Sequence, residues 1–193
     1  INTPIVFMDR RIDKTGNMGS VQIDNYSAMK DVAHYISSKG CKKIAYISAD
    51  ISQSPSHERY DGFIDGLHEC GISFDKRLHY AGTFSVETGQ LGAMTLLQTS
   101  PDIDCIVCGN DLMAIGAINI CQKLGRNIPD DISIMGFDDI YISKYLNPGL
   151  TTVRQDAYEM GRQAASMLIE YLDEHTPLSD VVLPYQIIER NTV

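Results

Sequence analysis

Several apolar runs in this chain are followed by polar or aromatic side chains that could together bind a small hydrophilic molecule. In an open parallel sheet, ligands bind outside the carboxyl ends of the strands. If these runs are parallel strands, the side chains that follow them should meet in one polar cleft. The side chains in question are Asp9, Arg10, Arg59, Phe84, Asn110 and Asp138.

The chemistry that such a set offers is recognition of a sugar. Carboxylates and amides accept or exchange directional hydrogen bonds with vicinal hydroxyls, and guanidinium groups donate from a fixed fork. An aromatic ring can cover the apolar face of a pyranose, and a closed site excludes water. The candidates are the acids and amides Asp9, Asn110, Asp138 and Gln155, the guanidinium donors Arg10 and Arg59, and the ring of Phe84.

Each candidate taken alone also has an ordinary structural explanation. Asn110 or Asp111 directly after a strand is typically a helix N-cap, and Arg59 in a first helical turn is typically a solvated charge. Phe84 could belong to the core, and Asp138-Asp139 could be turn residues or a second helix cap. Asp9 could form a local surface ion pair worth about 0–1 kcal/mol. The shared position at one end of the sheet favours a common site over these separate explanations.

Apolar runs rich in Ile and Val alternate with helical patterns along most of the chain. The runs are nearly continuous, which is typical of strands covered on both faces. They lie at about 4–8, 20–23, 43–48, 78–81, 104–108 and 132–136. Apolar residues at helical spacing predict helices at about 27–38, 57–70, 85–98 and 111–124. Such a series of short βαβ units predicts an α/β fold with a doubly wound parallel sheet.

The pattern changes after Pro148 and Gly149. Residues 150–153 form a short extended segment, and a long amphipathic helix is predicted at about 156–173. The run at 185–188 predicts a last strand.

The first predicted strand, 4–8, has few possible neighbours. Only the strand at 20–23 and the helix at 156–173 could join it in a lobe. Two strands and one helix bury too little apolar surface to be stable alone. We therefore expect the sequence to begin partway through a lobe of a longer protein.

Composition narrows the classes of function. The 193 residues suffice for one large domain or two small lobes, and the net charge of −9 disfavours binding of nucleic acid by bulk electrostatics. No stretch approaches the roughly 18 apolar residues of a membrane span.

The five cysteines lack framework spacing and indicate free thiols in a reducing cytoplasm. Cys105 and Cys108 have the spacing of half a metal site, but residues three apart in a strand point to opposite faces. We therefore expect no metal.

Motifs of enzymes are missing. There is no Gly-x-Ser-x-Gly elbow and no His-Glu-x-x-His, because His57-Glu58 lacks the second histidine. No glycine-rich loop for phosphates is present. Asp102 and Asp104 form a carboxylate pair, but they precede a strand and so lie opposite the cleft. We expect neither catalysis nor a cofactor.

The order of several short motifs resembles the effector-binding domain of LacI/GalR-type bacterial transcription repressors. The resemblance covers essentially the whole chain, and only the ordered set is specific. The motifs are Asp24-Asn25-Tyr26, Arg59-Tyr60-Asp61-Gly62-Phe63, Asn110-Asp111-Leu112-Met113-Ala114-Ile115-Gly116, Pro129-Asp130-Asp131-Ile132-Ser133-Ile134-Met135-Gly136-Phe137-Asp138-Asp139, Leu150-Thr151-Thr152-Val153-Arg154-Gln155 and Glu189-Arg190-Asn191-Thr192.

The resemblance implies the two-lobe fold of periplasmic sugar-binding proteins of the ribose-binding type, with the N-terminal lobe incomplete. It implies a C-terminal lobe of residues 24–149 plus 181–193 and a partial N-terminal lobe of residues 1–23 plus 151–178. Asp9 and Arg10 together favour a pentose or a similar monosaccharide. The implied ligand contacts are Asp9, Arg10, Arg59, Phe84, Asn110, Asp138 and Gln155.

The resemblance also implies partners and a mode of action. A sugar effector bound between the lobes would alter the DNA affinity of a cytoplasmic homodimer. Operator DNA would be bound through an N-terminal helix-turn-helix, which the 193 residues do not contain. The alternative is the periplasmic sugar-binding component of a transporter, whose pocket would look alike.

Overall fold

The predicted alternation of strands and helices is present in the computed structural model, which describes residues 3–10, 17–52 and 54–193. The strands are β1 Ile5–Met8, β2 Met18–Ile23, β3 Ile44–Ala49, β4 His79–Gly82, β5 Cys105–Cys108, β6 Ser133–Asp138, β7 Thr151–Gln155, β8 Asp180–Leu183 and β9 Tyr185–Ile188. The helices are α1 Asn25–Ser38, α2 Ser56–Glu69, α3 Val86–Thr99, α4 Asp111–Lys123 and α5 Ala157–Glu174, with short 3₁₀ turns η1 Lys76–Leu78 and η2 Tyr141–Tyr145.

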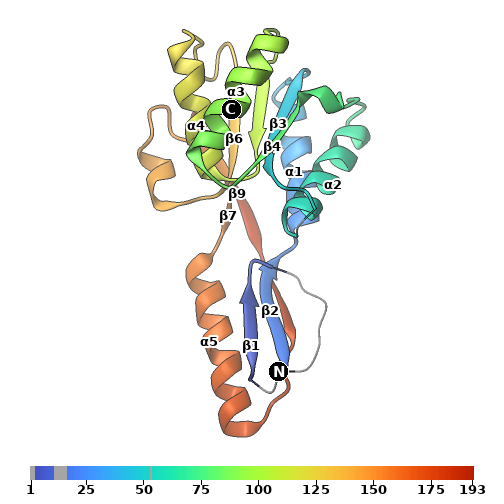
Figure 1. The fold of residues 1–193 in the computed structure, drawn as a ribbon, viewed down its shortest axis with the longest axis vertical. Coiled ribbons are helices and arrows are strands. Elements are labelled where there is room, and N and C mark those ends of the chain that lie inside the picture. Colours follow the sequence, from blue (N-terminus) through green and yellow to red (C-terminus); the bar gives the residue numbers. More distant parts are fainter. Residues whose placement is uncertain (1–2, 11–16, 53) are drawn as a thin grey trace.

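The larger sheet has the strand order β4-β3-β5-β6-β7-β9. All neighbours in it are parallel except β7 and β9. Helices α1 and α2 cover one face and α3 and α4 the other, so that two separate apolar cores form (Figure 1). Alternate residues of β5 enter different cores: Cys105 packs with α1 and α2, and Cys108 with α3 and α4. The predicted opposite orientation of these two cysteines is therefore confirmed.

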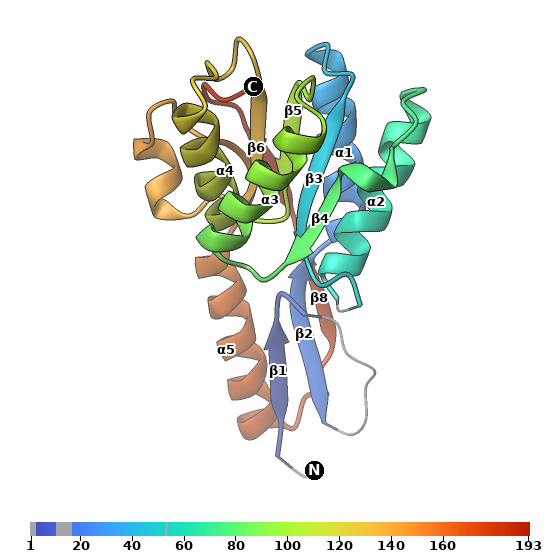
Figure 2. The ribbon, with the colours of Figure 1, turned by 45° about the horizontal axis from the view of Figure 1, so that its top comes forward.

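The smaller sheet has the order β1-β2-β8, with all three strands parallel. Helix α5 packs along β1 and β2, and its residues Met160 and Ala164 are buried (Figure 2). The chain passes between the two sheets at three places, namely from β2 to α1, from β7 to α5 and from β8 to β9. The molecule is consequently elongated, with the smaller lobe below the larger one in both views.

Two short strands lie in sheets other than those expected. Residues 151–155, expected in the smaller lobe, form β7 and pair with β6 of the larger sheet. Residues 181–183, expected in the larger lobe, belong to β8 and pair with β2 of the smaller sheet. The Pro148-Gly149 break ends a loop within the larger lobe. We therefore place the lobe boundaries at the three crossings.

The helix ends follow local side-chain chemistry. Asp24, Ser85 and Asp156 each accept a hydrogen bond from a backbone N–H in the first turn of the helix that follows. Gly71 and Gly125 follow α2 and α4 with φ of 73°, the left-handed conformation that terminates helices. Local side chains and glycines therefore determine where these helices begin and end.

Helix α2 lies so close to α1 that one of its positions admits only glycine. A Cβ atom at Gly62 would lie 2.1 Å from the carbonyl oxygen of Tyr26, which is backbone and cannot rotate away. This approach fixes the part of α2 that carries Arg59, one turn before Gly62.

We predict that Gly62→Ala lowers the free energy of unfolding by about 1–3 kcal/mol, because the added methyl group must push the two helices apart. The matched control is Gly161→Ala in α5, where a Cβ meets nothing within 4 Å. That change should raise stability by about 0.5–1 kcal/mol. Urea unfolding of both variants measures the difference. An unchanged midpoint for Gly62→Ala would contradict the close helix contact.

Candidate ligand-binding site

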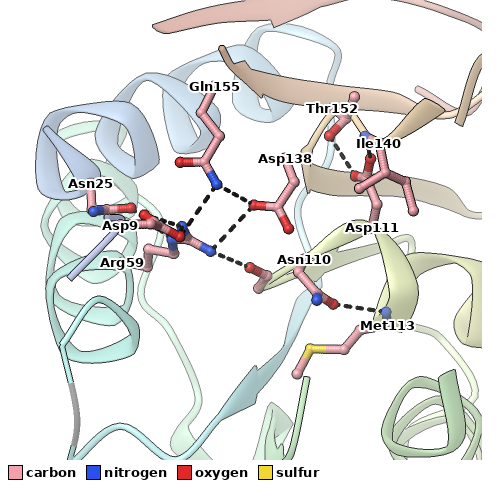
Figure 3. A network of polar contacts seen from close by, with 11 residues as sticks. Asp9, Asn25, Arg59, Asn110, Asp111, Met113, Asp138, Ile140, Thr152 and Gln155 are labelled. Carbon is pink, nitrogen blue, oxygen red and sulfur yellow. Dashed lines mark hydrogen bonds and ion pairs between the residues drawn. The ribbon is translucent and has the colours of Figure 1, made fainter. Parts of the chain in front are cut away.

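Arg59 lies at the centre of a polar network between the lobes (Figure 3). Its side chain is only 2% exposed. The Nε atom donates to Asn25 Oδ1 at 2.8 Å and Nη1 donates to the carbonyl oxygen of Gly109 at 2.9 Å. The Nη2 atom lies 3.4 Å from both carboxylate oxygens of Asp9. The alternative explanation of Arg59 as a solvated charge is therefore wrong.

An aromatic ring supports the same guanidinium group. The Cζ atom of Arg59 lies 3.8 Å from the ring centroid of Phe137, which is fully buried at the end of β6. A desolvated cation over an aromatic face is stabilised by the ring quadrupole. The guanidinium plane is thus held on one face by the ring and at its edge by hydrogen-bond acceptors.

Asp9 and Asp138 approach this guanidinium from different lobes. Asp9 follows β1 of the smaller lobe, and Asp138 ends β6 of the larger lobe. Asp138 Oδ1 lies 3.8 Å from Arg59 Nη1 and accepts a hydrogen bond of 2.7 Å from Gln155 Nε2. The same Gln155 nitrogen lies 3.4 Å from Asp9 Oδ2. Gln155 is the last residue of β7, directly before a crossing, so the network bridges both lobes.

Burial dominates the electrostatics of Asp138 and raises the pKa of its carboxyl group to about 7. The negative charges of Asp111 and Asp9 raise this pKa further. The Arg59 charge and the hydrogen bond from Gln155 act in the opposite direction. The charge of this carboxylate therefore changes near neutral pH.

A cleft of about 470 Å³ opens beside the network. The Phe84 side chain at its edge is 42% exposed, so its ring is available to a ligand. Arg10 is also exposed. Six of the seven candidate residues line this cleft, and Gln155 contacts two of them. The lining residues are Met8, Asp9, Arg10, Pro55, Arg59, Phe84, Asn110 and Asp138.

Asn110 combines the two roles that its position suggested. Its Oδ1 accepts a hydrogen bond of 2.9 Å from the backbone N–H of Met113 and so caps α4. This bond leaves the amide nitrogen free of the cap, on the side of the network in Figure 3. The N-cap explanation is therefore confirmed, and the residue still lines the cleft.

Asp111, the neighbour of Asn110, is a fully buried carboxylate with a structural role. Its Oδ2 accepts from Ser143 Oγ at 2.5 Å and from the backbone N–H of Ile140 at 2.9 Å, and its Oδ1 accepts from Thr152 Oγ1 at 2.6 Å. These bonds tie η2 and β7 to the start of α4. The segment that follows Asp138 is thereby fixed.

The sequence did not single out several residues that hold the network. Asn25, the Gly109 carbonyl and Phe137 all contact the Arg59 side chain. Asn25 and Phe137 stand within the motifs that carry the family resemblance, but their roles depend on where α2 lies. The Gly109 contact is made by a backbone carbonyl, and the type of a residue does not indicate which group its backbone carbonyl will bind.

The described part of the chain meets the requirements of neither a metal site nor a membrane-spanning helix. Among them, no group of three or more His, Cys, Asp or Glu side chains could hold a metal ion. None of their helices is long and apolar enough to cross a membrane.

Known proteins resemble this chain over nearly all of its length. The family described as periplasmic binding protein-like domain matches residues 33–193. The HTH-type transcriptional repressor CytR of Escherichia coli K12 is 30% identical over 192 residues, which are 99% of this chain and 56% of that protein. The ribose operon repressor of Halalkalibacterium halodurans is 30% identical over 194 residues, which are 100% and 57% respectively.

Solved structures agree with this family. A complex of the transcriptional regulator CelR with cellobiose superposes with a TM-score of 0.90 at 26% identity, covering 97% of this chain and 58% of that chain. The transcription regulator CcpA of Lactococcus lactis gives a TM-score of 0.89 at 30% identity, covering 98% and 69%.

The chain spans 56% and 57% of the lengths of the two curated relatives, both of which are repressors. The expected α/β class and the expected two-lobe architecture are confirmed. The chain belongs to the periplasmic binding protein-like domain family, in the form that LacI-type transcription regulators share.

Proposed function

We propose that this chain is the effector-binding region of a sugar-responsive transcription repressor. The observation that carries the proposal is the network around Arg59, in which acids from both lobes and an amide at a crossing face one cleft. Carboxylates, amides and a guanidinium group are the partners that vicinal hydroxyls require. The seven candidate residues from the sequence are the proposed ligand contacts.

The network also has unused hydrogen-bonding capacity. Within the described residues, the buried Nδ2 of Asn25 and the buried Oε1 of Gln155 have no hydrogen-bond partner. Buried polar atoms are nearly always paired with protein groups or with ordered water. A polyol with donor and acceptor hydroxyls, alone or through a bridging water, can supply both kinds of partner.

The mode of action follows from where the contacts stand. A ligand held by Asp9 on one lobe and by Asp138 on the other contributes binding energy that depends on the angle between the lobes. It therefore shifts the population of lobe arrangements, and no covalent chemistry is needed. A typical coupling free energy of about 1–3 kcal/mol would change operator affinity by about 5–150-fold.

The relatives support the remaining parts of the proposal. CytR is named as an HTH-type repressor, and CelR was solved with cellobiose. By analogy, the whole protein would be a cytoplasmic homodimer without enzymatic activity that binds operator DNA through a helix-turn-helix outside the present 193 residues. Because these relatives are transcription regulators, a repressor is favoured over a transporter component.

We predict that Asp138→Ala abolishes most of the affinity for the sugar, at least about 100-fold, because a charged hydrogen-bond acceptor is lost from a buried site. Isothermal titration calorimetry against a panel of pentoses and hexoses measures the loss. Asp102→Ala is the matched control, because Asp102 lies at the opposite end of the sheet, is 70% exposed and pairs only with Lys43 among the contacts described. Equal affinities for wild type and Asp138→Ala would refute the assignment.

Sugar affinity should also depend on pH. Asp138 has a pKa of about 7, and only its charged form accepts hydrogen bonds through both oxygens. Lowering the pH from 8 to 6 protonates most of this carboxyl group and should weaken binding by about ten-fold. The Asp138→Asn variant cannot titrate at this position, so its residual affinity should be the same at both pH values. The same titrations at pH 6, 7 and 8 provide the measurement, and a flat wild-type profile would disprove this dependence.

A further inference from the structure

Two of the five cysteines lie against each other at the end of the larger sheet opposite the cleft. Cys41 follows α1, and Cys105 is the first residue of β5. The Cys105 thiol donates a hydrogen bond to the Cys41 sulfur, as does the side chain of Ser133, which lies beside Cys105 on β6. Cys41 is 8% exposed and Cys105 is fully buried. The pair therefore combines a thiol that a small molecule can reach with one that only its neighbour can reach.

The chain reversal at the end of α1 turns Cys41 toward the sheet. Gly40 has φ of 91°, a left-handed conformation that glycine adopts freely. The backbone N–H of Cys41 then donates to the carbonyl oxygen of Ile36 at 3.2 Å, as at many helix ends that close on a glycine. Cys41 itself belongs to neither a helix nor a strand. It can therefore approach Cys105 to the sulfur–sulfur distance of about 2.05 Å in a disulfide without deforming the sheet.

Hydrogen bonds of the next two residues hold this segment against the start of β5. The backbone N–H groups of Lys42 and Lys43 donate to the carboxylate of Asp104 at 2.9–3.1 Å. The backbone N–H of Asp104 in turn donates to the carbonyl oxygen of Lys43 at 3.1 Å. Lys42 directly follows Cys41, and Asp104 directly precedes Cys105, so the backbone keeps the two thiols together.

The surroundings of the two thiols give them different reactivities. The hydrogen bonds from Cys105 and Ser133 lower the pKa of the Cys41 thiol, although burial and the charge of Asp104 act in the opposite direction. The contact with Cys41 and complete burial raise the pKa of Cys105 well above its ordinary value. The thiolate is the nucleophilic form of cysteine. Cys41 is therefore the reactive thiol, and Cys105 is placed to attack whatever Cys41 becomes.

From this arrangement we propose that Cys41 and Cys105 form a reversible disulfide when the protein meets a peroxide. The Cys41 sulfur attacks one peroxide oxygen, so that an S–O bond forms and the O–O bond breaks. The released hydroxide takes up a proton to give water, and Cys41 is left as a sulfenic acid. The Cys105 thiol then loses its proton, and its sulfur attacks that of Cys41. The S–S bond forms as the S–O bond breaks, and the leaving hydroxide takes up this proton as water. Two thiols are oxidised while one peroxide is reduced to two waters.

This bond would join the end of α1 to the start of β5. The opposite ends of these two elements carry Asn25 and the carbonyl group of Gly109, which both accept hydrogen bonds from Arg59. Oxidation would thus link two of the elements that hold Arg59 while leaving the proposed sugar contacts unmodified. The test of the disulfide does not depend on the identity of the effector.

The test is mass spectrometry of the chain after treatment with a small excess of hydrogen peroxide. Cys70 is the most exposed of the five thiols, and Cys70→Ser prevents bonds between chains. We expect the Cys70→Ser chain to lose about 2 Da, the mass of the two hydrogens removed. A non-reducing digest should contain one peptide pair joined through Cys41 and Cys105, and dithiothreitol should separate it.

Two variants separate the steps of the reaction. Cys105→Ala should stop the reaction at the sulfenic acid of Cys41, which dimedone then labels. Cys41→Ser should abolish both the label and the cross-link. Cys108 and Cys121, which both lie in the other core, are the internal control. Burial raises the pKa of Cys108, and it raises the pKa of Cys121 to about 11, so both should remain thiols.

Cys41 should lose its thiol at least about ten-fold faster than Cys121 at the same peroxide concentration, because the attack requires a thiolate. A folded Cys70→Ser chain that forms no link between Cys41 and Cys105 would overturn the proposal. A link between Cys108 and Cys121 that forms at the same rate would also overturn it, because oxidation would then be independent of the surroundings of Cys41. Neither outcome depends on the folding of Cys105→Ala.

Discussion

The buried guanidinium group of Arg59 is the constraint around which both lobes are arranged. A desolvated cation is tolerated in a protein only when acceptors and opposite charges surround it. Here they come from α1, the end of β5, β6 and the smaller lobe, through Asn25, Gly109, Asp138 and Asp9. Because the Arg59 guanidinium group needs all of these partners, segments far apart in the sequence come together around it. The cleft lies where these segments meet.

A second buried charge, the carboxylate of Asp111, supports the first. It receives hydrogen bonds from η2 and β7, and so fixes the chain on both sides of the loop that follows Asp138. A Cβ atom at Gly136 would lie 2.2 Å from its Oδ1, so the strand that delivers Asp138 must pass close to it. Burial raises the pKa of Asp111, and its negative charge raises the pKa of Asp138. The Asp111 side chain thus both anchors the loop that follows Asp138 and raises the pKa of Asp138.

The features that depend on local pattern could be predicted from the sequence, and those that depend on distant partners could not. Near-continuous apolar runs located β3, β5 and β6, because both faces of these strands are buried. The strand β8 was not predicted, because its residues alternate between exposed and half-buried and give a weak signal. The assignment of β8 failed because its hydrogen-bonding partner β2 lies more than a hundred residues away. The assignment of β7 failed for another reason: the break at Pro148-Gly149 suggested a lobe boundary, whereas β7 pairs with β6, which is near in the sequence.

The same distinction applies to the candidate site. The strand-end rule brought Asp9, Arg59, Asn110 and Asp138 together correctly as a geometric group. It did not reveal that Arg59 is buried, since an arginine in a first helical turn looks solvated until α2 is placed against Phe137. It also gave no reason to distinguish Asn110, which caps the helix, from Asp111, which anchors the neighbouring loop.

The backbone conformation at two of the acids lowers the stability of the fold, whereas their carboxylates serve the binding of the ligand. Asp9 and Asp138 have φ of 50° and 109°, values that glycine adopts freely and that strain other residues by about 1–3 kcal/mol. Glycine at either position would relax the chain but delete the carboxylate. Selection for higher folding stability and selection for ligand binding therefore favour different residues at these two positions. Homologous chains that have lost their signal molecule would be expected to drift toward glycine there.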